Sequence, residues 1–121
     1  MEDKYLNEKI SIMVIHINDT EVEIKFSFKA EILYEQAQNE SFQGKTTGDW
    51  LVYFFCQIIA NTNDGFISFD EYLNWVSDPT NAVAFYEFIE YYTQYQKNIL
   101  DLRTLKKKEV TKKKPETKKK K

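Results

Sequence analysis

The segment from Trp50 to Ile59 constrains the fold of this chain more than any other. Placed on a helix of 3.6 residues per turn, its apolar side chains surround the whole circumference instead of forming one stripe. Such a helix is stable in water only when other elements cover every side of it. We therefore predict a central, most buried helix with Trp50 and Phe54 in the core. The apolar residues are Trp50, Leu51, Val52, Tyr53, Phe54, Phe55, Ile58 and Ile59.

The segment before this helix predicts a β-hairpin. Residues 10–17 are rich in β-branched side chains, and residues 21–28 alternate strictly between polar and apolar. Asn18-Asp19 or Asp19-Thr20 supplies the tight turn, because Asn and Asp tolerate a positive φ. The first strand is apolar on both faces, so we expect helices or another chain to cover its second face or its free edge. The alternation places Val22, Ile24, Phe26 and Phe28 on one face of the second strand.

Four helices are expected along the chain. Residues 29–39 carry apolar side chains three and four apart, and Thr47 is expected to cap the central helix, which ends near Ala60. A third helix is predicted from Phe69 to Ser77, and a fourth from about Thr80 to near Leu100 with Pro79 in its first turn. The fold class is α+β, mainly α, with an N-terminal β-hairpin packed on about four helices.

The charges divide the chain at residue 100. Residues 1–100 carry 6 lysines and 16 acidic residues, whereas residues 101–121 carry 11 basic and 3 acidic residues. The second segment lacks apolar periodicity from Lys106 onward, and burial there cannot offset the entropy of ordering. We predict a hairpin plus helical domain over residues 1–100 and a disordered basic tail over residues 101–121.

Composition also bears on compartment and partners. The longest apolar run, residues 50–56, is too short for a membrane span, and the charged N-terminus does not resemble a secretory signal. The single cysteine, Cys56, lies within the central helix and is expected to be a buried thiol in a reducing, cytoplasmic environment. An acidic body repels nucleic acid, and the tail has no aromatic residue for base stacking, so nucleic-acid binding is not expected.

Residues 60–71 resemble an EF-hand calcium loop in part. Gly65, Ile67 and Glu71 match its turn, apolar and bidentate positions, but Ala60 stands at the first ligand position. A turn at Asp64-Gly65 followed by a capping box from Ser68 to Glu71 explains the same residues. We favour the turn and cap, with degenerate calcium binding as the alternative.

Little in the sequence indicates catalysis. His16 is the only histidine and falls in a predicted strand, so we expect no Ser/His/Asp triad, no Cys/His pair and no multi-histidine metal site. Glu21 and Glu23 share a strand face with Lys25, a pattern typical of a solvated surface. With only 3 glycines, the chain has no phosphate-binding loop. We expect a binding or assembly protein and no enzyme, with no cofactor and no metal.

The fourth helix has a wider aromatic face than one core contact requires. Aromatic side chains anchor many protein interfaces, so we interpret this face as partner-binding. The residues assigned to it are Phe85, Phe88, Tyr91, Tyr92 and Tyr95.

The order of elements resembles that of the tail assembly chaperones of long-tailed phages. The hairpin segment 15–30, the segment 47–55 and the segment 67–76 are similar to the hairpin, the core helix and the following helix of that family, although Asp19 stands where the family usually has Gly. The resemblance covers residues 10–78. It implies a protein of the bacterial host cytoplasm that coats the tape-measure protein and brings tail-tube subunits to it. Separately, the doubly apolar first strand and the aromatic last helix are expected of a protein that self-associates or wraps a partner's helix, so we expect a homo-oligomer or a complex with the tape-measure protein. The alternatives are a degenerate EF-hand protein and an adaptor that acts through its tail.

Overall fold

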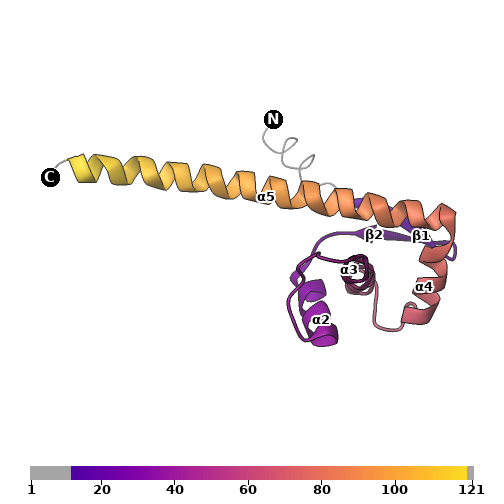
Figure 1. The fold of residues 1–121 in the computed structure, drawn as a ribbon. Helices are drawn as coiled ribbons and strands as arrows, with labels where there is room; N and C mark the ends of the chain where they lie inside the picture. The colour runs from indigo at the N-terminus through magenta and orange to yellow at the C-terminus, as the bar shows by residue number, and fades with distance from the viewer. Residues whose placement is uncertain (1–11, 120–121) are drawn as a thin grey trace. The chain divides into compact units, whose positions relative to one another are not determined.

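The computed structural model describes residues 12–119, with side chains up to Leu105. Within this range it contains a two-stranded sheet and four helices, which confirms the predicted α+β, mainly α, fold class. Residues 12–91 form one compact unit, and the part of α5 from Tyr92 onward belongs to a second. The elements are β1 (Met13–Ile17), β2 (Thr20–Ile24), α2 (Phe28–Gln38), α3 (Thr47–Ala60), α4 (Phe69–Ser77) and α5 (Pro79–Lys119), labelled in Figure 1.

The hairpin forms where the sequence predicts it. β1 and β2 pair antiparallel with Ile17 opposite Thr20, and both turn residues, Asn18 and Asp19, have positive φ. This geometry is a two-residue type I′ turn, whose twist matches that of the strands. One face of the hairpin is buried through Ile15, Ile17, Val22 and Ile24.

The prediction that Phe28 belongs to the apolar face of the second strand is wrong. Phe28 is 87% exposed and is the first residue of α2. Ser27 ends the alternation because its side chain accepts a hydrogen bond from the N–H of Ala30, which makes Ser27 the N-cap of α2. β2 ends at Ile24 and residues 25–27 connect it to α2, although the apolar alternation in the sequence continues through Phe28.

The central helix is α3, as predicted. In Figure 1 it is seen end-on between α2 and α4. It buries six residues, more than α2 or α4, and Phe54 is fully buried whereas Trp50 is only half-buried. Its N-cap is Thr46 instead of the predicted Thr47, because the Thr46 hydroxyl and the Asp49 carboxylate form a reciprocal capping box.

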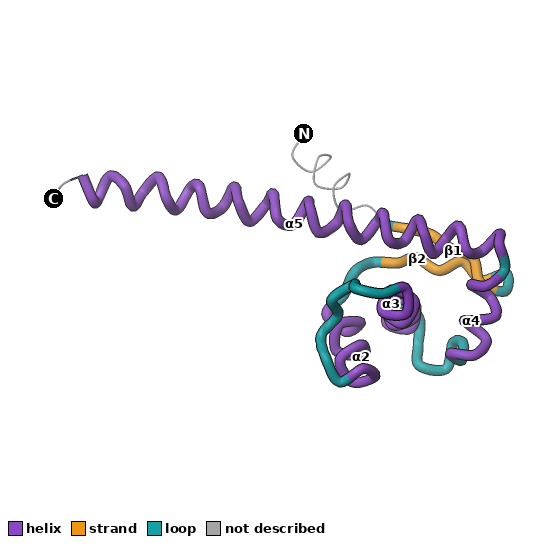
Figure 2. The backbone as a smooth tube through the Cα atoms, viewed as in Figure 1, coloured by secondary structure: helices purple, strands orange, loops and turns teal. Residues whose placement is uncertain are grey.

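The loop between α2 and α3, drawn in teal in Figure 2, contributes one aromatic side chain to the packing. The Phe42 ring stacks on Tyr53 with centroids 4.0 Å apart and lies edge-on to Trp50 at 4.9 Å. Phe42 is also edge-on to Tyr34 of α2 at 5.3 Å. The loop therefore closes one end of the α2–α3 pair.

The structure corrects the predicted end of the last helix. α5 begins at Pro79, as expected, but continues past Leu100 to Lys119. Residues 101–119, assigned by the sequence to a disordered tail, are thus the last turns of α5. Lysine, leucine, arginine and glutamate favour helix, and no glycine interrupts the segment, so local propensity supports a helix beyond Leu100 despite the absence of apolar periodicity. Pro115 is the residue of the segment that disfavours a helix interior.

Candidate functional site: an apolar groove beside the central helix

The aromatic face predicted to bind partners is divided between core and surface. Phe85 is 4% exposed and Phe88 is fully buried. The Phe88 ring stacks on Phe54 with centroids 4.5 Å apart and is edge-on to Trp50 at 6.4 Å. The assignment of Phe85 and Phe88 to a partner-binding face is therefore wrong, because α3 already covers them.

The three tyrosines remain half-buried. Tyr91 stacks on Phe26 at 4.8 Å, and its hydroxyl donates to the carbonyl oxygen of Ile24, so it fastens α5 to the end of β2. Tyr92 and Tyr95 lie in the second unit, where the Tyr92 hydroxyl accepts a hydrogen bond from Gln96. Tyr91 therefore has a structural role, and a partner-binding role for Tyr92 and Tyr95 stays a prediction.

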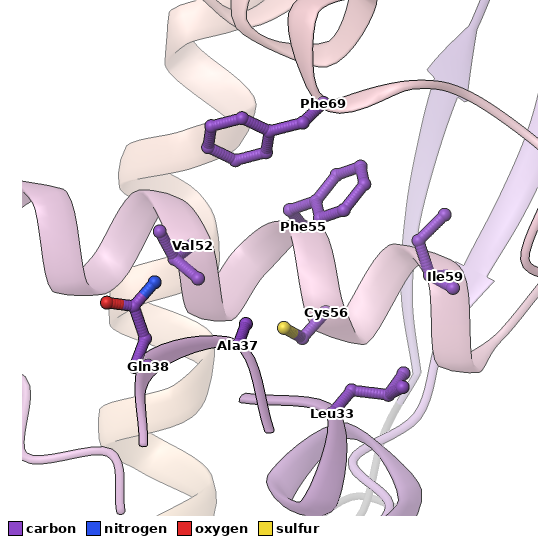
Figure 3. A pocket seen from close by; sticks show the side chains of 8 residues that line it. All are labelled: Leu33, Ala37, Gln38, Val52, Phe55, Cys56, Ile59 and Phe69. Carbon is purple, nitrogen blue, oxygen red and sulfur yellow. The ribbon is translucent and has the colours of Figure 1, made fainter. Parts of the chain in front are cut away.

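An apolar groove lies between α2 and α3 in the first unit. It has a volume of about 400 Å³ and is closed on one side by the first residue of α4. Figure 3 shows the side chains converging on it from the three helices. We call it the α2–α3 groove, lined by Leu33, Ala37, Gln38, Val52, Phe55, Cys56, Ile59 and Phe69.

Helical periodicity explains why these residues meet. Leu33 and Ala37 are four apart on α2, and the α3 residues recur at spacings of three and four. Side chains at such spacings lie on one face of a helix. The Phe69 ring meets Phe55 edge-on at 5.1 Å, which fixes the start of α4 against the groove. The side of α3 that neither α5 nor the hairpin covers therefore lines the α2–α3 groove.

The floor of the groove is apolar and unreactive. Cys56 and Ile59 are buried, and burial, assisted by the nearby Glu31 carboxylate, raises the pKa of the Cys56 thiol to about 11. A thiol with so high a pKa holds little thiolate near neutral pH. The prediction that Cys56 is a buried small side chain and no nucleophile agrees with this environment.

A polar chain lies beside the groove within the α2–α3 interface. The Tyr53 hydroxyl donates to the Glu31 carboxylate, and Gln57 Nε2 donates to the Tyr53 oxygen at 3.0 Å. Gln57 is fully buried, and its Oε1 accepts no hydrogen bond from the part of the chain that the structure describes. These groups align α2 with α3 and do not line the groove.

The unit that contains the groove is strongly acidic. Residues 12–91 carry 13 acidic and 3 basic side chains. None of the three lysines, Lys25, Lys29 and Lys45, lines the groove. The first unit therefore combines an apolar recess with a negative field around it.

The loop that resembles a calcium site has the structure of a turn and a cap. The Ser68 hydroxyl accepts from the Glu71 N–H at 3.1 Å, and the Glu71 carboxylate accepts from the Ser68 N–H at 2.9 Å. Asn63 Oδ1 accepts from the Gly65 N–H, which closes the turn. The predicted capping box is confirmed, and it uses the carboxylate that would have to hold calcium.

Sequence reasoning did not find the groove. The pattern predicts Val52, Phe55 and Ile59 in the core. Leu33 and Ala37 are four apart within the helix expected over residues 29–39, but their periodicity does not show which element lies opposite them. The available signal was Ala37, a small side chain that leaves space opposite α3. Among the side chains that the structure describes, residues 12–105, no group of three His, Cys, Asp or Glu is placed to hold a metal ion.

Comparisons with protein-family models, curated proteins and solved structures give no match to this chain. No helix in the described range is long and apolar enough to cross a membrane. The α2–α3 groove and the surfaces around it therefore provide the basis for a functional proposal.

Proposed function

We propose that this protein is a tail assembly chaperone of a long-tailed phage, which holds helical segments of the tape-measure protein in the α2–α3 groove and brings tail-tube subunits to them. The single observation that carries the binding part of this proposal is the groove itself. It is apolar, open and about 400 Å³ in volume, which suits the side chains of one face of an amphipathic helix.

The resemblance of residues 10–78 supplies the identity of the partner. Three features that carry it are present as elements: the hairpin, the helix α3, and the capped helix α4. They lie within one compact unit of residues 12–91. The groove is built from α2, α3 and the first residue of α4. Two of these helices, α3 and α4, carry the resemblance, and α2 lies between the hairpin and α3, which supports the proposal.

The charge of the unit favours one kind of segment within such a partner. With 13 acidic against 3 basic side chains, residues 12–91 attract lysine and arginine side chains that flank an apolar stripe. An apolar stripe with basic flanks is therefore the segment that the groove should select. A chaperone with these properties shields apolar helix surface while its own charge keeps the complex dispersed.

The test is co-purification with fragments of the tape-measure protein encoded beside this gene. Ala37→Glu places a carboxylate at the groove, where it would be desolvated only in the complex, whereas Gln36→Glu adds the same charge on α2 outside the groove lining. We expect Ala37→Glu to weaken binding at least about tenfold, which corresponds to ~1.4 kcal/mol, and Gln36→Glu to retain it.

Two outcomes would contradict the proposal. The first is an intact protein that captures no tape-measure or tail-tube protein. The second is binding that Ala37→Glu and Gln36→Glu weaken equally, which would place the contact outside the groove. Thermal melts of both variants check that each retains the fold.

A further inference from the structure

The apolar stripe of α5 continues past the aromatic core. Phe85 and Phe88, which pack on Phe54 of α3, are followed on the same face of α5 by apolar residues at alternating spacings of three and four. This spacing places a continuous seam along one side of a helix, as in a coiled coil, where another segment packs against it. We call the continuation the α5 seam, and it consists of Tyr92, Tyr95, Ile99 and Leu102.

The α5 seam is shielded on one side of the helix. Its side chains are half-buried, and Asn98 beside them is only 5% exposed. Leu100, which points away from the seam at 100° per residue, is 59% exposed, and Leu105, just past the end of the seam, is 57% exposed. The turns of a single helix cannot bury an asparagine to this degree. The one-sided burial therefore indicates a segment packed along α5 that ends before Leu105.

The hairpin register shows which segment lies within reach. Met13, the first residue of β1, is paired with Ile24 of β2. The Tyr91 hydroxyl donates to the carbonyl oxygen of the same Ile24 at 3.0 Å. Residues 1–11, which precede the described range, therefore lead into the fold beside Tyr91, directly before the seam begins at Tyr92.

We propose that residues 1–11 pack along the α5 seam of the same chain. The seam from Tyr92 to Leu102 is about 15 Å long at the rise of an α-helix. Eleven residues span about 16 Å as a helix and up to about 36 Å when extended, so the segment can reach the whole seam. Its large apolar side chains between the charged ones are Tyr5, Leu6 and Ile10.

Charge and tethering favour this segment over another molecule. Residues 1–11 carry three acidic and two basic side chains, whereas residues 92–105 carry one acidic and two basic side chains, so the contact is not opposed by like charge. A short tether gives an effective concentration of about 1 mM, far above that of a second copy in a micromolar solution. Tyr92 and Tyr95 then belong to an internal contact, and a partner helix reaches them only by displacing residues 1–11.

Paramagnetic broadening in the full-length protein tests the contact. A nitroxide on Glu2→Cys should broaden the amide signals of residues 92–102, and the native Cys56 is buried and reacts slowly with the label. Leu6→Glu in the labelled chain should abolish the broadening, because the contact would bury a carboxylate against apolar side chains. Lys4→Gln is the control, since it changes the net charge by the same amount and should retain the broadening.

Hydrogen exchange of the unlabelled variants measures the protection that the segment gives to α5. Leu6→Glu should speed the exchange of amides in residues 92–102 at least about tenfold, whereas Lys4→Gln should change it less than about twofold. Thermal melts of both variants check that residues 12–91 retain their fold. Equal exchange in the two variants would contradict the contact.

Three further results would overturn the inference: no broadening in the labelled chain, broadening that Leu6→Glu retains, and broadening that passes between molecules. The last is measured by mixing nitroxide-labelled chain with isotope-labelled chain that carries no nitroxide, and it would show that a second copy occupies the seam. These results are independent of tape-measure binding, because the α5 seam shares no residue with the α2–α3 groove.

Discussion

The rings of Phe54 and Phe88 stack with centroids 4.5 Å apart and an interplanar angle of 21°, and both side chains are fully buried. Phe54 also lies 6.1 Å from the Tyr72 ring of α4. One residue of α3 thus contacts both helices that follow it in the chain. This pair is the point at which α3, α4 and the first turns of α5 share a core.

We predict that Phe54→Ala and Phe88→Ala each lower the free energy of unfolding by about 3 to 5 kcal/mol, because each leaves a cavity among aromatic rings. Urea denaturation measures the change. Tyr86→Ala is the control, since Tyr86 is 64% exposed and its removal should cost less than about 1 kcal/mol. A loss below 1 kcal/mol for Phe88→Ala would show that Phe88 belongs to a binding surface after all.

The capping box at α4 gives a second prediction. Ser68→Ala removes the acceptor for the Glu71 N–H and should cost about 1 kcal/mol of stability. Millimolar calcium should leave the melting temperature of the wild-type protein unchanged. A calcium-dependent rise of several degrees that Glu71→Gln abolishes would contradict the turn-and-cap interpretation.

The pKa of Glu71 sets the direction of a pH effect. Hydrogen bonds from the Ser68 backbone N–H and then its side chain lower the pKa of this carboxyl below its ordinary value. A lowered folded-state pKa contributes stability above the ordinary pKa that is lost as the pH falls through the folded-state value. Between pH 6 and pH 3 the wild-type protein should therefore lose more unfolding free energy than Glu71→Gln does. Denaturant melts across this pH range measure the difference. An unchanged pH profile would contradict this role.

Burial of Cys56 predicts low thiol reactivity. Because the pKa of the Cys56 thiol is raised to about 11, a thiol reagent at pH 8 should react far more slowly with folded protein than with protein in denaturant. Stability linked to this thiol is fully present below its ordinary pKa and falls as the pH rises toward 11, since the unfolded chain ionises first. Cys56→Ser should flatten the alkaline part of that profile. Equal labelling rates for folded and unfolded protein would contradict the buried position.

Asn61 joins the hairpin to α3 through a pair of hydrogen bonds. Its Oδ1 accepts from the Lys25 N–H at 3.1 Å, and its Nδ2 donates to the Lys25 carbonyl at 3.0 Å and to the Gln57 carbonyl at 2.8 Å. Asn61→Asp keeps the acceptor but sets a carboxylate against two carbonyl oxygens. We expect a loss of about 1 to 3 kcal/mol at pH 7 and a smaller loss at pH 4, where the carboxyl can donate. Equal losses at both pH values would exclude this explanation.

The sequence predicted the elements whose signals are local. The alternation of Val22 and Ile24, the turn at Asn18-Asp19, the Ser68 cap and Pro79 each act over a few residues, and the structure has the expected element at each position. Phe28 was assigned to the strand because the alternation of polar and apolar residues continues through it. The helix cap at Ser27 places Phe28 in α2 instead. Phe88 was misplaced because a helical stripe shows which residues share a face but not which neighbour covers that face.

The α2–α3 groove could not be predicted for a related reason. Its lining comes from three helices, and its volume depends on how far α2 stands from α3. That spacing is set by contacts distant in the chain, such as Phe42 on Tyr53 and the hydrogen bond from Tyr53 to Glu31. Periodicity along one helix contains no information about these contacts.

The last prediction concerns the basic end of α5. Residues 106–119 hold eight lysines and two glutamates, and like charges four residues apart in a sequence disfavour a helix. The Debye length falls to about 3 Å at 1 M salt, which is shorter than the spacing of about 5 to 6 Å between residues one helical turn apart, so the helical content of this segment should rise at that salt concentration. The measurement is the circular dichroism of the full chain minus that of a chain ending at Leu105, at low and at high salt. The shorter chain should keep the unfolding free energy of the first unit within about 0.5 kcal/mol, because the segment adds no periodic apolar residue. A larger loss would show that residues 106–121 stabilise the domain.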